Sequence, residues 1–403
     1  MSITRDGTSA SSTSKGKAHY LFDLDGFSGN VTELLEAFRR FYGNFDIAYS
    51  FKTNYLKAAC DTILSLGCCA EVVSPFEYEY AKQLGFPDRR IIFNGVIPCD
   101  VKYSVLRAGG MVNVDCLDEY LRLEALAERE KAHISVGVRV NFEVDGATSR
   151  FGVDLTGDDF KTIIRRVARS RFVSLGGFHH HLHGRRSVRY WKRRALTLAA
   201  MVKEYDARYV DLGGGMWGKM PESLSRQFSE KPDAYADYGK QIGGILAEMF
   251  PDASVKLIIE PGIGLVGNVM ECVSHVVGIK SICGKQYVQL DIDGADTAFD
   301  YNCDANRIRK PFRILRSGET PPVRLTGADF VGTTCTEIDT LVRDFNGELS
   351  VGDAIIFENV GAYSLVTSRQ FITPRLGVYD AQSRECLLNP ETSDDMFRNY
   401  LNF

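Results

Sequence analysis

The feature that most constrains the fold is a regular alternation of short apolar segments with helix-patterned segments between residues 45 and 260. Eight segments rich in β-branched and aromatic residues indicate strands: Phe45–Phe51, Ala70–Val73, Arg90–Phe93, Met111–Val114, Ile134–Val140, Val173–His181, Tyr209–Leu212 and Val255–Ile259. Amphipathic segments lie between them, including Leu117–Arg129, Asp158–Ser170, Ser187–Tyr205 and Tyr235–Met249. Short strands joined by helices form right-handed βαβ units and a parallel sheet. Eight strands in about 215 residues predict a closed (β/α)8 barrel, with an open doubly wound sheet as the alternative.

The rhythm changes after about residue 265, where strand-like segments follow one another without long helices. These segments are Val266–Ile282, Tyr287–Ile292, Val323–Thr326 and Asp353–Phe357, and Tyr20–Leu24 is an early strand that could join them. A chain of 403 residues has room for two domains. We therefore predict a barrel over residues 27–265 and a β-rich domain, a sandwich or a barrel, over residues 19–26 and 266–403. The Ser/Thr/Gly/Lys-rich residues 1–18 indicate a flexible tail.

The composition of the chain indicates which kinds of binding partner and which cellular compartment to expect. The chain has 48 Lys and Arg against 52 Asp and Glu, a net charge of −4, which argues against charge-driven nucleic-acid binding. No apolar run approaches the roughly 20 residues of a spanning helix, and the N-terminus lacks the apolar core of a secretory signal. Ten cysteines without a Cys-x-x-Cys pair indicate reduced thiols. We expect a cytoplasmic protein with neither a nucleic-acid nor a membrane partner.

Unusual residues fall at the carboxyl ends of the expected strands, where barrel enzymes place their sites. Lys52 closes the first strand in Tyr49-Ser-Phe-Lys-Thr-Asn54. Burial at that point would lower the pKa of its amine, which a Schiff-base lysine requires. A solvated lysine just past the strand is the alternative.

Three successive histidines occupy the end of the sixth strand, in Gly177-Phe-His-His-His-Leu-His-Gly184. His179 and His181 share one face of the strand and His180 faces the other way. Such a group suits a metal ion, an imidazole stacked on a flat cofactor, or ordinary core histidines. Because no His/Glu pair at helical spacing and no nearby acidic residue accompanies it, we expect no metal.

Two further motifs follow the last two strands. Asp211-Leu-Gly-Gly-Gly215 lets backbone N–H groups approach an anion, and Glu260-Pro-Gly262 offers a carboxylate for a pyridinium N–H. Glu71 and Glu77 bracket the end of the second strand. Together with Lys52 and the histidines, these motifs meet the needs of pyridoxal 5′-phosphate: an amine, a phosphate site, a stacking ring and an acid for the ring nitrogen.

At this point the sequence resembles the fold-type III decarboxylases, the family of eukaryotic ornithine decarboxylase and bacterial diaminopimelate decarboxylase, from Tyr20 to the C-terminus. Seven ordered motifs carry the resemblance: Tyr20-Leu-Phe-Asp-Leu-Asp25, Tyr49-Ser-Phe-Lys-Thr-Asn54, Gly177-Phe-His-His-His181, Gly213-Gly-Gly215, Glu260-Pro-Gly262, Cys335-Thr-Glu-Ile-Asp339, and Val351-Gly-Asp353 with Glu358-Asn-Val-Gly-Ala-Tyr363. The resemblance implies a pyridoxal-phosphate barrel, a C-terminal β-domain and a head-to-tail homodimer with two shared active sites.

The resemblance also implies roles for individual residues. Lys52 carries the cofactor, Glu260 holds the pyridine nitrogen, and His181 stacks on the ring. Cys335 enters the site from the partner subunit and supplies a proton after CO2 leaves. The residues implied around the phosphate or in supporting positions are Gly213, Gly214, Gly215, Gly262, Tyr363, Glu71, Glu77 and Arg139.

Two departures from the family pattern bear on the phosphate site and on the substrate. The family usually has an arginine after Glu-Pro-Gly, where this chain has Ile263, and we expect Arg185 or Arg186 to replace its charge. The position after Cys335 is acidic in enzymes for diamino acids, but here it is Thr336. The acidic residues that could substitute for it are Glu337, Asp293 and Asp296.

We therefore predict α-decarboxylation of an amino acid with a different or bulkier distal end, such as an intermediate of a specialised metabolite. A branch of the family resembling the decarboxylase of microcin C maturation, which acts on an aminocarboxypropyl group, has similarly altered motifs. Two alternatives stay open: an amino-acid racemase on the same scaffold, and a decarboxylase-like regulatory homologue without cofactor.

Overall fold

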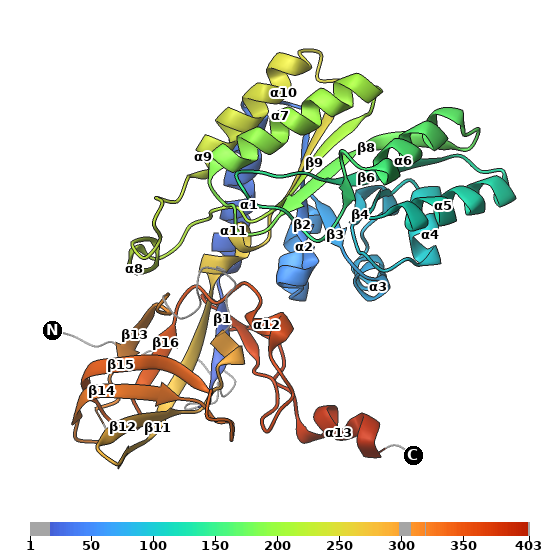
Figure 1. The fold of residues 1–403 in the computed structure, drawn as a ribbon. Coiled ribbons are helices and arrows are strands. Elements are labelled where there is room, and N and C mark those ends of the chain that lie inside the picture. The colour runs from blue at the N-terminus through green and yellow to red at the C-terminus, as the bar shows by residue number, and fades with distance from the viewer. Residues whose placement is uncertain (1–16, 298–307, 319, 402–403) are drawn as a thin grey trace.

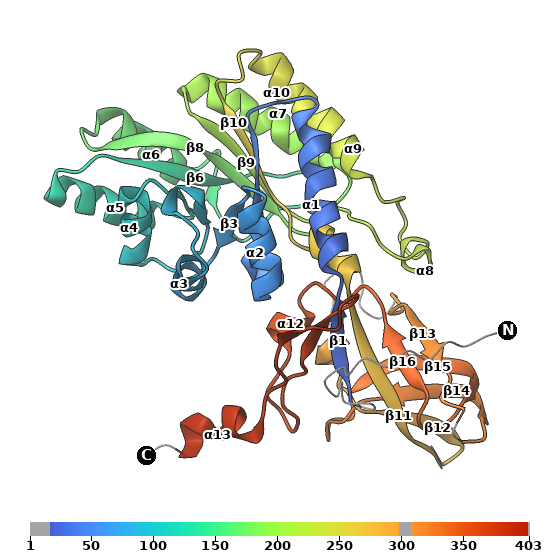
Figure 2. The ribbon, with the colours of Figure 1, turned by 180° about the vertical axis from the view of Figure 1, so that it is seen from behind.

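The computed structural model describes residues 17–297, 308–318 and 320–401 and shows two bodies joined at a narrower waist (Figure 1). A helix-covered barrel forms one body and a sheet domain the other, and the view from behind shows the same division (Figure 2). The predicted tail, residues 1–18, lies outside the described residues except for residues 17 and 18. We retain the predicted domain boundaries as a proposal.

Eight parallel strands close into the predicted barrel, because β10 pairs with β2 and β5 pairs with β6. This confirms the closed barrel over the open sheet. A two-residue strand, β7 (Val153–Asp154), adds to the edge of β6. The eight barrel strands are β2 (Phe45–Ser50), β3 (Cys69–Val72), β4 (Ile91–Phe93), β5 (Met111–Val114), β6 (Ile134–Asn141), β8 (Val173–Leu182), β9 (Tyr209–Gly214) and β10 (Lys256–Glu260).

Helices cover the outside of the barrel with their apolar faces turned to the strands (Figure 1). They are α1 (Leu24–Arg39), α2 (Lys57–Ser65), α3 (Pro75–Gln83), α4 (Asp100–Arg107), α5 (Leu117–Glu130), α6 (Asp158–Arg169), α7 (Val188–Tyr205), α9 (Tyr235–Tyr238) and α10 (Gly244–Met249). The short α8 (Glu222–Ser225) lies on a loop that projects from the barrel, and α11 (Ile263–Val266) lies at the junction with the sheet domain (Figure 1). None of the described helices is long and apolar enough to cross a membrane.

The segment Tyr235–Met249, predicted as one helix, instead contains a π-helical stretch, Gly239–Gly243, between α9 and α10. The cause is close packing against α1. A Cβ at Gly239 would lie 2.0 Å from the carbonyl oxygen of Ala37, so only glycine permits this approach. Such a tertiary contact leaves no mark in the hydrophobic periodicity.

The second body is a nine-stranded mixed sheet. Its strands are β1 (His19–Phe22), β11 (Met270–Ile282), β12 (Lys285–Leu290), β13 (Phe312–Leu315), β14 (Val323–Val331), β15 (Thr340–Leu349), β16 (Ala354–Phe357), β17 (Val378–Asp380) and β18 (Cys386–Leu388). The early strand does join it, since β1 pairs antiparallel with β11 and parallel with β17. Two helices, α12 (Ser364–Thr367) and α13 (Ser393–Leu401), complete the chain.

The expected strand Val266–Ile282 is wrong at its start. Residue Val266 ends α11, a 3-10 turn follows over Gly267–Val269, and the strand begins at Met270. The run is apolar because it is buried at the domain junction, and periodicity alone cannot separate a buried helical turn from a strand. The sequence also missed four strands of this domain, namely β13, β15, β17 and β18.

The sheet domain meets the carboxyl ends of the barrel strands. The chain passes directly from β10 through α11 into β11. From the other direction, Tyr363 N–H donates to Thr53 O at 2.9 Å, and Asn54 Nδ2 donates to Gly361 O at 2.9 Å. The candidate site therefore lies between the two domains.

Candidate active site

Lys52 stands in a 3-10 turn that follows β2, and Glu71 lies on the neighbouring strand β3. The parallel register pairs Ser50 with Glu71, so the carboxylate reaches the end of β2. Ser50 Oγ donates to Glu71 Oε2 at 2.7 Å, and Lys52 Nζ forms an ion pair with the same oxygen. The Lys52 side chain keeps 29% exposure, whereas that of Glu71 keeps 1%.

The predicted lowering of the Lys52 pKa is wrong. Burial alone would lower the pKa of this amine, but the charges of Glu71 and Glu260 outweigh burial and raise the pKa above its ordinary value. The prediction failed because both carboxylates reach the lysine from other strands. In the structure Lys52 is therefore an ammonium at neutral pH.

Glu260 ends β10 and is fully buried inside the barrel mouth. Its Oε2 lies 3.2 Å from His179 Nε2 and 3.7 Å from His181 Nδ1, and Asn94 Nδ2 donates to Oε1. Burial would raise the pKa of Glu260, but His179, His181 and Lys52 hold it well below its usual range. This carboxylate is ionised and ready to accept a hydrogen bond from a ring N–H.

The three histidines divide as predicted. His179 and His181 point into the barrel toward Glu260, whereas His180 points outward to α7. Burial and the nearby charges of Arg139 and Lys52 lower the pKa of His181 to about 3, so its ring is neutral. The ligand atoms of His179, His181 and Glu260 lie within 4.8 Å of one another, close enough for a metal ion, but the same carboxylate is where a pyridinium would need it.

A buried polar network below Glu260 was not anticipated from the sequence. Asn113 Nδ2 donates to Asn94 Oδ1 at 2.8 Å and to Asp211 Oδ2 at 3.0 Å, and Tyr209 OH donates to Asn113 Oδ1 at 2.8 Å. Burial and the Glu260 charge raise the pKa of Asp211 far above its usual range, so Asp211 is protonated. The only sequence signal was the polar Asn113 within the apolar strand Met111–Val114.

The glycine loop Gly213–Gly215 comprises the last two residues of β9 and the residue that follows them. Gly214 has φ +109°, and a Cβ at Gly213 would lie 2.1 Å from Glu260 Oε2 and 2.6 Å from His181 Nδ1. A side chain at either position would therefore be strained or clash. A cleft opens beside this loop; we call it the mouth cleft, and its lining residues are Ser50, Lys52, Thr53, His181, His183, Arg186, Gly214, Gly215, Glu260, Gly262, Ile263 and Tyr363.

The mouth cleft fits pyridoxal phosphate. It offers an amine, an ionised acid, a neutral imidazole and a glycine loop in one small space. Thr53 Oγ1 is buried there without a hydrogen-bond partner among the described residues, and a Cβ at Gly262 would stand 2.1 Å from it. An unpartnered hydroxyl beside two glycine segments suits a phosphate oxygen.

The structure separates the two candidate replacements for the missing arginine. Arg186 is 4% exposed, lines the mouth cleft, and approaches a Cβ at Gly215 to 3.1 Å. Arg185 instead donates to Asp145 O at 3.2 Å and lies over the ring of Tyr190. Of the two arginines, Arg186 lines the mouth cleft and Arg185 does not, a distinction that sequence alone could not make between adjacent residues.

None of the three predicted supporting residues lines the mouth cleft: Glu71 reaches it through its ion pair with Lys52, whereas Glu77 and Arg139 have other partners. Glu77 lies in the first turn of α3, where its own N–H donates to the Oγ of the N-cap residue Ser74 at 3.1 Å and its carboxylate accepts from Val73 N–H at 2.7 Å. Burial raises the pKa of Glu77 to about 7. Arg139 lies over Phe151 and bonds Asp115 Oδ1 at 3.3 Å.

The residues predicted to contact the substrate do not line this cleft either. Asp293 is buried and caps its own turn, accepting from Ala295 N–H at 2.6 Å. Cys335, Thr336 and Glu337 lie on an exposed loop of the sheet domain. That loop is anchored by Asp339, which accepts from Thr334 N–H and from Gly294 N–H, both at 2.9 Å.

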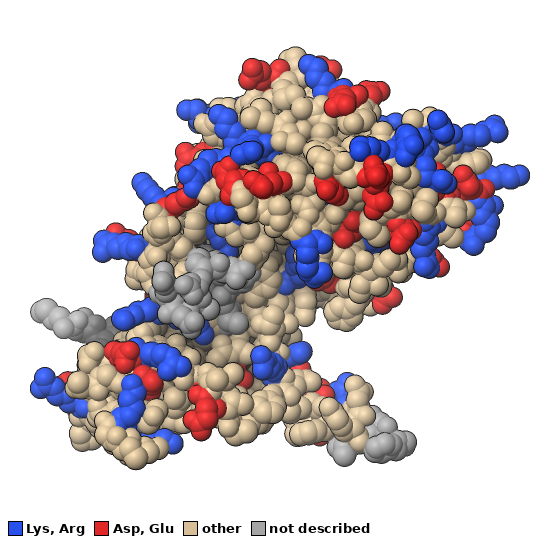
Figure 3. Space-filling view, in the orientation of Figure 1, with Lys and Arg blue, Asp and Glu red and all other residues tan. Residues whose placement is uncertain are grey.

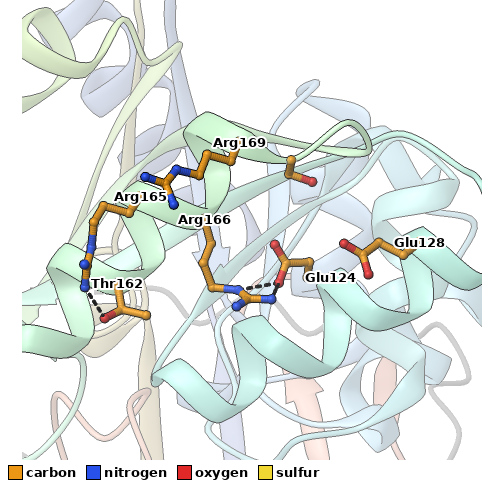
Figure 4. Close-up of a pocket in the computed structure, with 7 residues that line it drawn as sticks. Glu124, Glu128, Thr162, Arg165, Arg166 and Arg169 are labelled. Carbon is orange, nitrogen blue, oxygen red and sulfur yellow. Dashed lines mark hydrogen bonds and ion pairs between the residues drawn. The ribbon is translucent and has the colours of Figure 1, made fainter.

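A separate pocket on the outer wall of the barrel, between α5 and α6, is lined by charged residues (Figure 4). Arg166 pairs with the buried Glu124, and Arg165 donates to Thr162 Oγ1 at 3.1 Å. Elsewhere on the visible face acidic and basic side chains are interspersed (Figure 3). None of the residues that line this outer pocket belongs to the mouth cleft.

Comparisons with known proteins agree with this geometry. A model of the pyridoxal-binding domain of pyridoxal-dependent decarboxylases matches residues 28–267, and a model of their C-terminal sheet domain matches residues 200–361. Diaminopimelate decarboxylase of Aquifex aeolicus is 24% identical over 86% of this chain and 83% of its own length. A Staphylococcus aureus 2-[(L-alanin-3-ylcarbamoyl)methyl]-2-hydroxybutanedioate decarboxylase is 26% identical over 86% and 88%.

The fold recurs in solved structures. Diaminopimelate decarboxylase from Helicobacter pylori, crystallised with L-lysine, superposes with a TM-score of 0.81 at 22% identity, covering 96% of this chain and 97% of that one.

Proposed function

The chain belongs to the pyridoxal-dependent decarboxylases, and from this premise we propose which of its residues act and which kind of amino acid it takes. It is a pyridoxal-phosphate-dependent carboxy-lyase that converts an amino acid to an amine and CO2. The observation that carries the assignment of residues is the meeting of Lys52, Glu71, His181 and Glu260 at the carboxyl ends of four barrel strands.

Each of these residues has a distinct task. The cofactor, when bound, supplies a ring that accepts the electron pair left on the α-carbon as CO2 departs. Lys52 holds the cofactor and carries protons to and from it, and Glu260, being ionised, accepts a hydrogen bond from the ring N–H. His181 covers one face of the ring as a neutral imidazole. Gly213, Gly214, Gly215, Gly262, Tyr363 and Arg186 surround the phosphate.

Lys52→Ala tests this assignment directly. We expect purified wild-type protein with pyridoxal phosphate to absorb near the visible edge and the variant to lack that band and to release no CO2. Lys57→Ala is the matched control, because Lys57 is exposed on α2 and pairs with Asp61 on the same helix. A retained band in Lys52→Ala would overturn the role of Lys52.

We propose that Cys335 completes the site of a second copy in a homodimer. Its loop is exposed in the single chain, and the neighbouring Ile338 is 87% exposed, unusual for so apolar a side chain. The anchoring of this loop by Asp339 gives it a defined shape. A thiol held in this way can deliver a proton to the α-carbon once the partner's cleft lies beside it.

For the substrate we propose an α-amino acid whose distal end carries an acyl or carboxylate-bearing group in place of a free ammonium. Thr336 offers no charge for an ammonium, and the carboxylate of Asp293 is bound within its own turn. Asp296 is also occupied, accepting from Ser368 Oγ at 3.0 Å. The S. aureus relative, which is named for a substrate with an amide-linked hydroxybutanedioate, supports this class.

A panel measured by mass spectrometry, following loss of about 44 mass units as CO2, tests the substrate class. It contains ornithine, lysine, diaminopimelate, an N-acylated diamino acid and an aminocarboxypropyl compound. We expect the acylated or aminocarboxypropyl substrates to be preferred by at least about tenfold in kcat/KM, because a distal ammonium would find no acidic partner in the site. Preference for ornithine, lysine or another unacylated diamino acid would contradict the proposal.

No observation favours the two alternatives. A racemase would need a second proton donor on the opposite ring face, and the ionised Glu260 suits a decarboxylase. A cofactor-free homologue has no reason to keep Lys52, Glu260 and His181 within one cleft. We further propose a cytoplasmic location, supported by the finding that the nine cysteines of the described residues are all free thiols.

A further inference from the structure

Arg194 lies on α7, behind the glycine loop, and is fully buried. Its Nε donates to His180 Nδ1 at 3.1 Å, and its Nη2 donates to His180 O at 3.1 Å and to Gly213 O. Its Nη1 is buried and has no hydrogen-bond partner among the described residues. The guanidinium is therefore attached to the first carbonyl of the loop and is incompletely satisfied.

No carboxylate of the described residues forms an ion pair with Arg194, and the charge of Glu260, which also acts on the guanidinium, does not offset the effect of burial on its pKa. His180 cannot serve, since burial and the Arg194 charge lower the pKa of its ring to about 2 and keep it neutral. Burial lowers the pKa of Arg194 itself to about 9, which still leaves it charged at neutral pH. An unpaired buried charge destabilises a protein unless something else compensates it.

A second residue of α7 holds the other end of the same loop. Trp191 Nε1 donates to Gly215 O at 2.9 Å, and the guanidinium of Arg194 lies 4.7 Å from the Trp191 ring. In a trans peptide the C=O and N–H groups point in opposite directions. With the carbonyls of Gly213 and Gly215 turned to α7, the N–H groups of Gly214 and Met216 face away from it. Gly214 and Gly215 line the mouth cleft on that side.

We propose that Arg194 is a positioning residue for the cofactor phosphate, a buried counter-charge that acts through the Gly213–Gly215 loop without touching the ligand. The bound phosphate dianion adds negative charge to that of Glu260, which does not fully compensate Arg194, and Arg194 polarises the loop peptide so that its N–H groups favour an anion. Arg186 lines the mouth cleft itself, whereas Arg194 lies on α7, on the opposite side of the glycine loop. This inference rests on the proposed assignment of the loop to the phosphate.

The proposal has an unusual consequence for stability. Removing the charge should weaken binding of the phosphate-bearing cofactor and, at the same time, relieve the cofactor-free protein of an incompletely compensated buried cation. A residue that only supports the loop would do the opposite to the free protein, because its loss would lower stability in every state.

The test compares wild type, Arg194→Met and Arg194→Lys, with Trp191→Phe as a control that removes a loop hydrogen bond but no charge. Affinities for pyridoxal phosphate and for pyridoxal, which lacks the phosphate, are measured by absorbance titration, and thermal midpoints are measured without cofactor. We expect Arg194→Met to bind pyridoxal phosphate at least about tenfold more weakly, with pyridoxal changed less than about twofold. Its cofactor-free midpoint should equal or exceed that of wild type, and Arg194→Lys should recover most of the affinity.

Equal weakening of both ligands in Arg194→Met, or an unchanged affinity for pyridoxal phosphate, would overturn the proposal. The proposal would also be overturned if the thermal midpoint without cofactor fell as far in Arg194→Met as in Trp191→Phe. If Arg194→Met does not fold, the same comparison of the two ligands in Arg194→Gln decides, since loss of the charge should weaken only binding of the phosphate-bearing ligand. Failure of wild type itself to bind pyridoxal phosphate would instead strike the proposed function, so the two failures are distinguishable.

Discussion

The carboxylate of Glu71 holds the ammonium of Lys52 in an ion pair at the carboxyl ends of two adjacent barrel strands. Burial alone would lower the pKa of Lys52, but this contact, together with the Glu260 charge, raises it. The amine must lose a proton before it can attack a carbonyl. Glu71 therefore sets the pH range in which the cofactor is captured.

Glu71→Gln should shift cofactor capture to lower pH. Without the Glu71 charge, only Glu260 opposes the lowering of the Lys52 pKa by burial, so this pKa falls. The neutral amine is then populated at a pH lower by about one unit or more. The rate at which the visible absorbance appears after mixing with pyridoxal phosphate, measured from pH 6 to 9, gives the profile. Glu79→Gln is the control, because Glu79 is an exposed carboxylate on α3, the helix that follows β3. Coincident profiles for wild type and Glu71→Gln would refute the role of Glu71.

Mixing two inactive variants should restore activity if Cys335 acts in the partner's site. Lys52→Ala and Cys335→Ala each disable both sites of their own homodimer, but a mixed dimer keeps one intact site. Random exchange of subunits should return about a quarter of wild-type CO2 release. A mixture that stays inactive after verified subunit exchange would place Cys335 in the site of its own chain or outside the reaction.

The adjacent arginines should behave differently. Arg186→Gln removes a buried cation at the mouth cleft and should weaken pyridoxal-phosphate affinity about ten- to hundredfold, as expected for a partly desolvated contact to a phosphate. Arg185→Gln should change it less than about twofold, because Arg185 turns to Asp145 and Tyr190. Equilibrium titration of the two variants decides, and the reverse order would identify Arg185 as the phosphate ligand.

Glu77 should make stability depend on pH near neutrality. Its folded-state pKa of about 7 lies above the ordinary value, so the stability that its protonated form contributes is lost as pH rises through 7. Glu77→Gln keeps an oxygen for Val73 N–H and removes the charge, and should gain on the order of 2 kcal/mol over wild type at pH 8 but little at pH 5. Denaturant unfolding at both values measures this. The exposed Glu79→Gln on the same helix should show no such pH-dependent gain.

The sequence anticipated those parts of the site that depend on local spacing. Lys52, Glu260 and the histidines were assigned correctly to strand ends because each end follows from the hydrophobic run before it. The alternation of His179, His180 and His181 followed from strand geometry alone. The four missed strands are short or irregular, and β15 carries polar residues on both faces, so periodicity gave no signal.

What the amino-acid sequence determined by itself is the order of strands and helices, the barrel they close, and the reactive groups at its mouth, because these depend on periodicity within single segments. The tertiary structure alone decided the electrostatics. Glu71 reaches Lys52 only through the register of β2 and β3. Arg186 lines the mouth cleft, whereas the adjacent Arg185 turns to Asp145. Arg194 meets Gly213 only because α7 packs behind the loop. A pKa depends on every charge and on the burial around a group, and those are assembled from segments far apart in the chain.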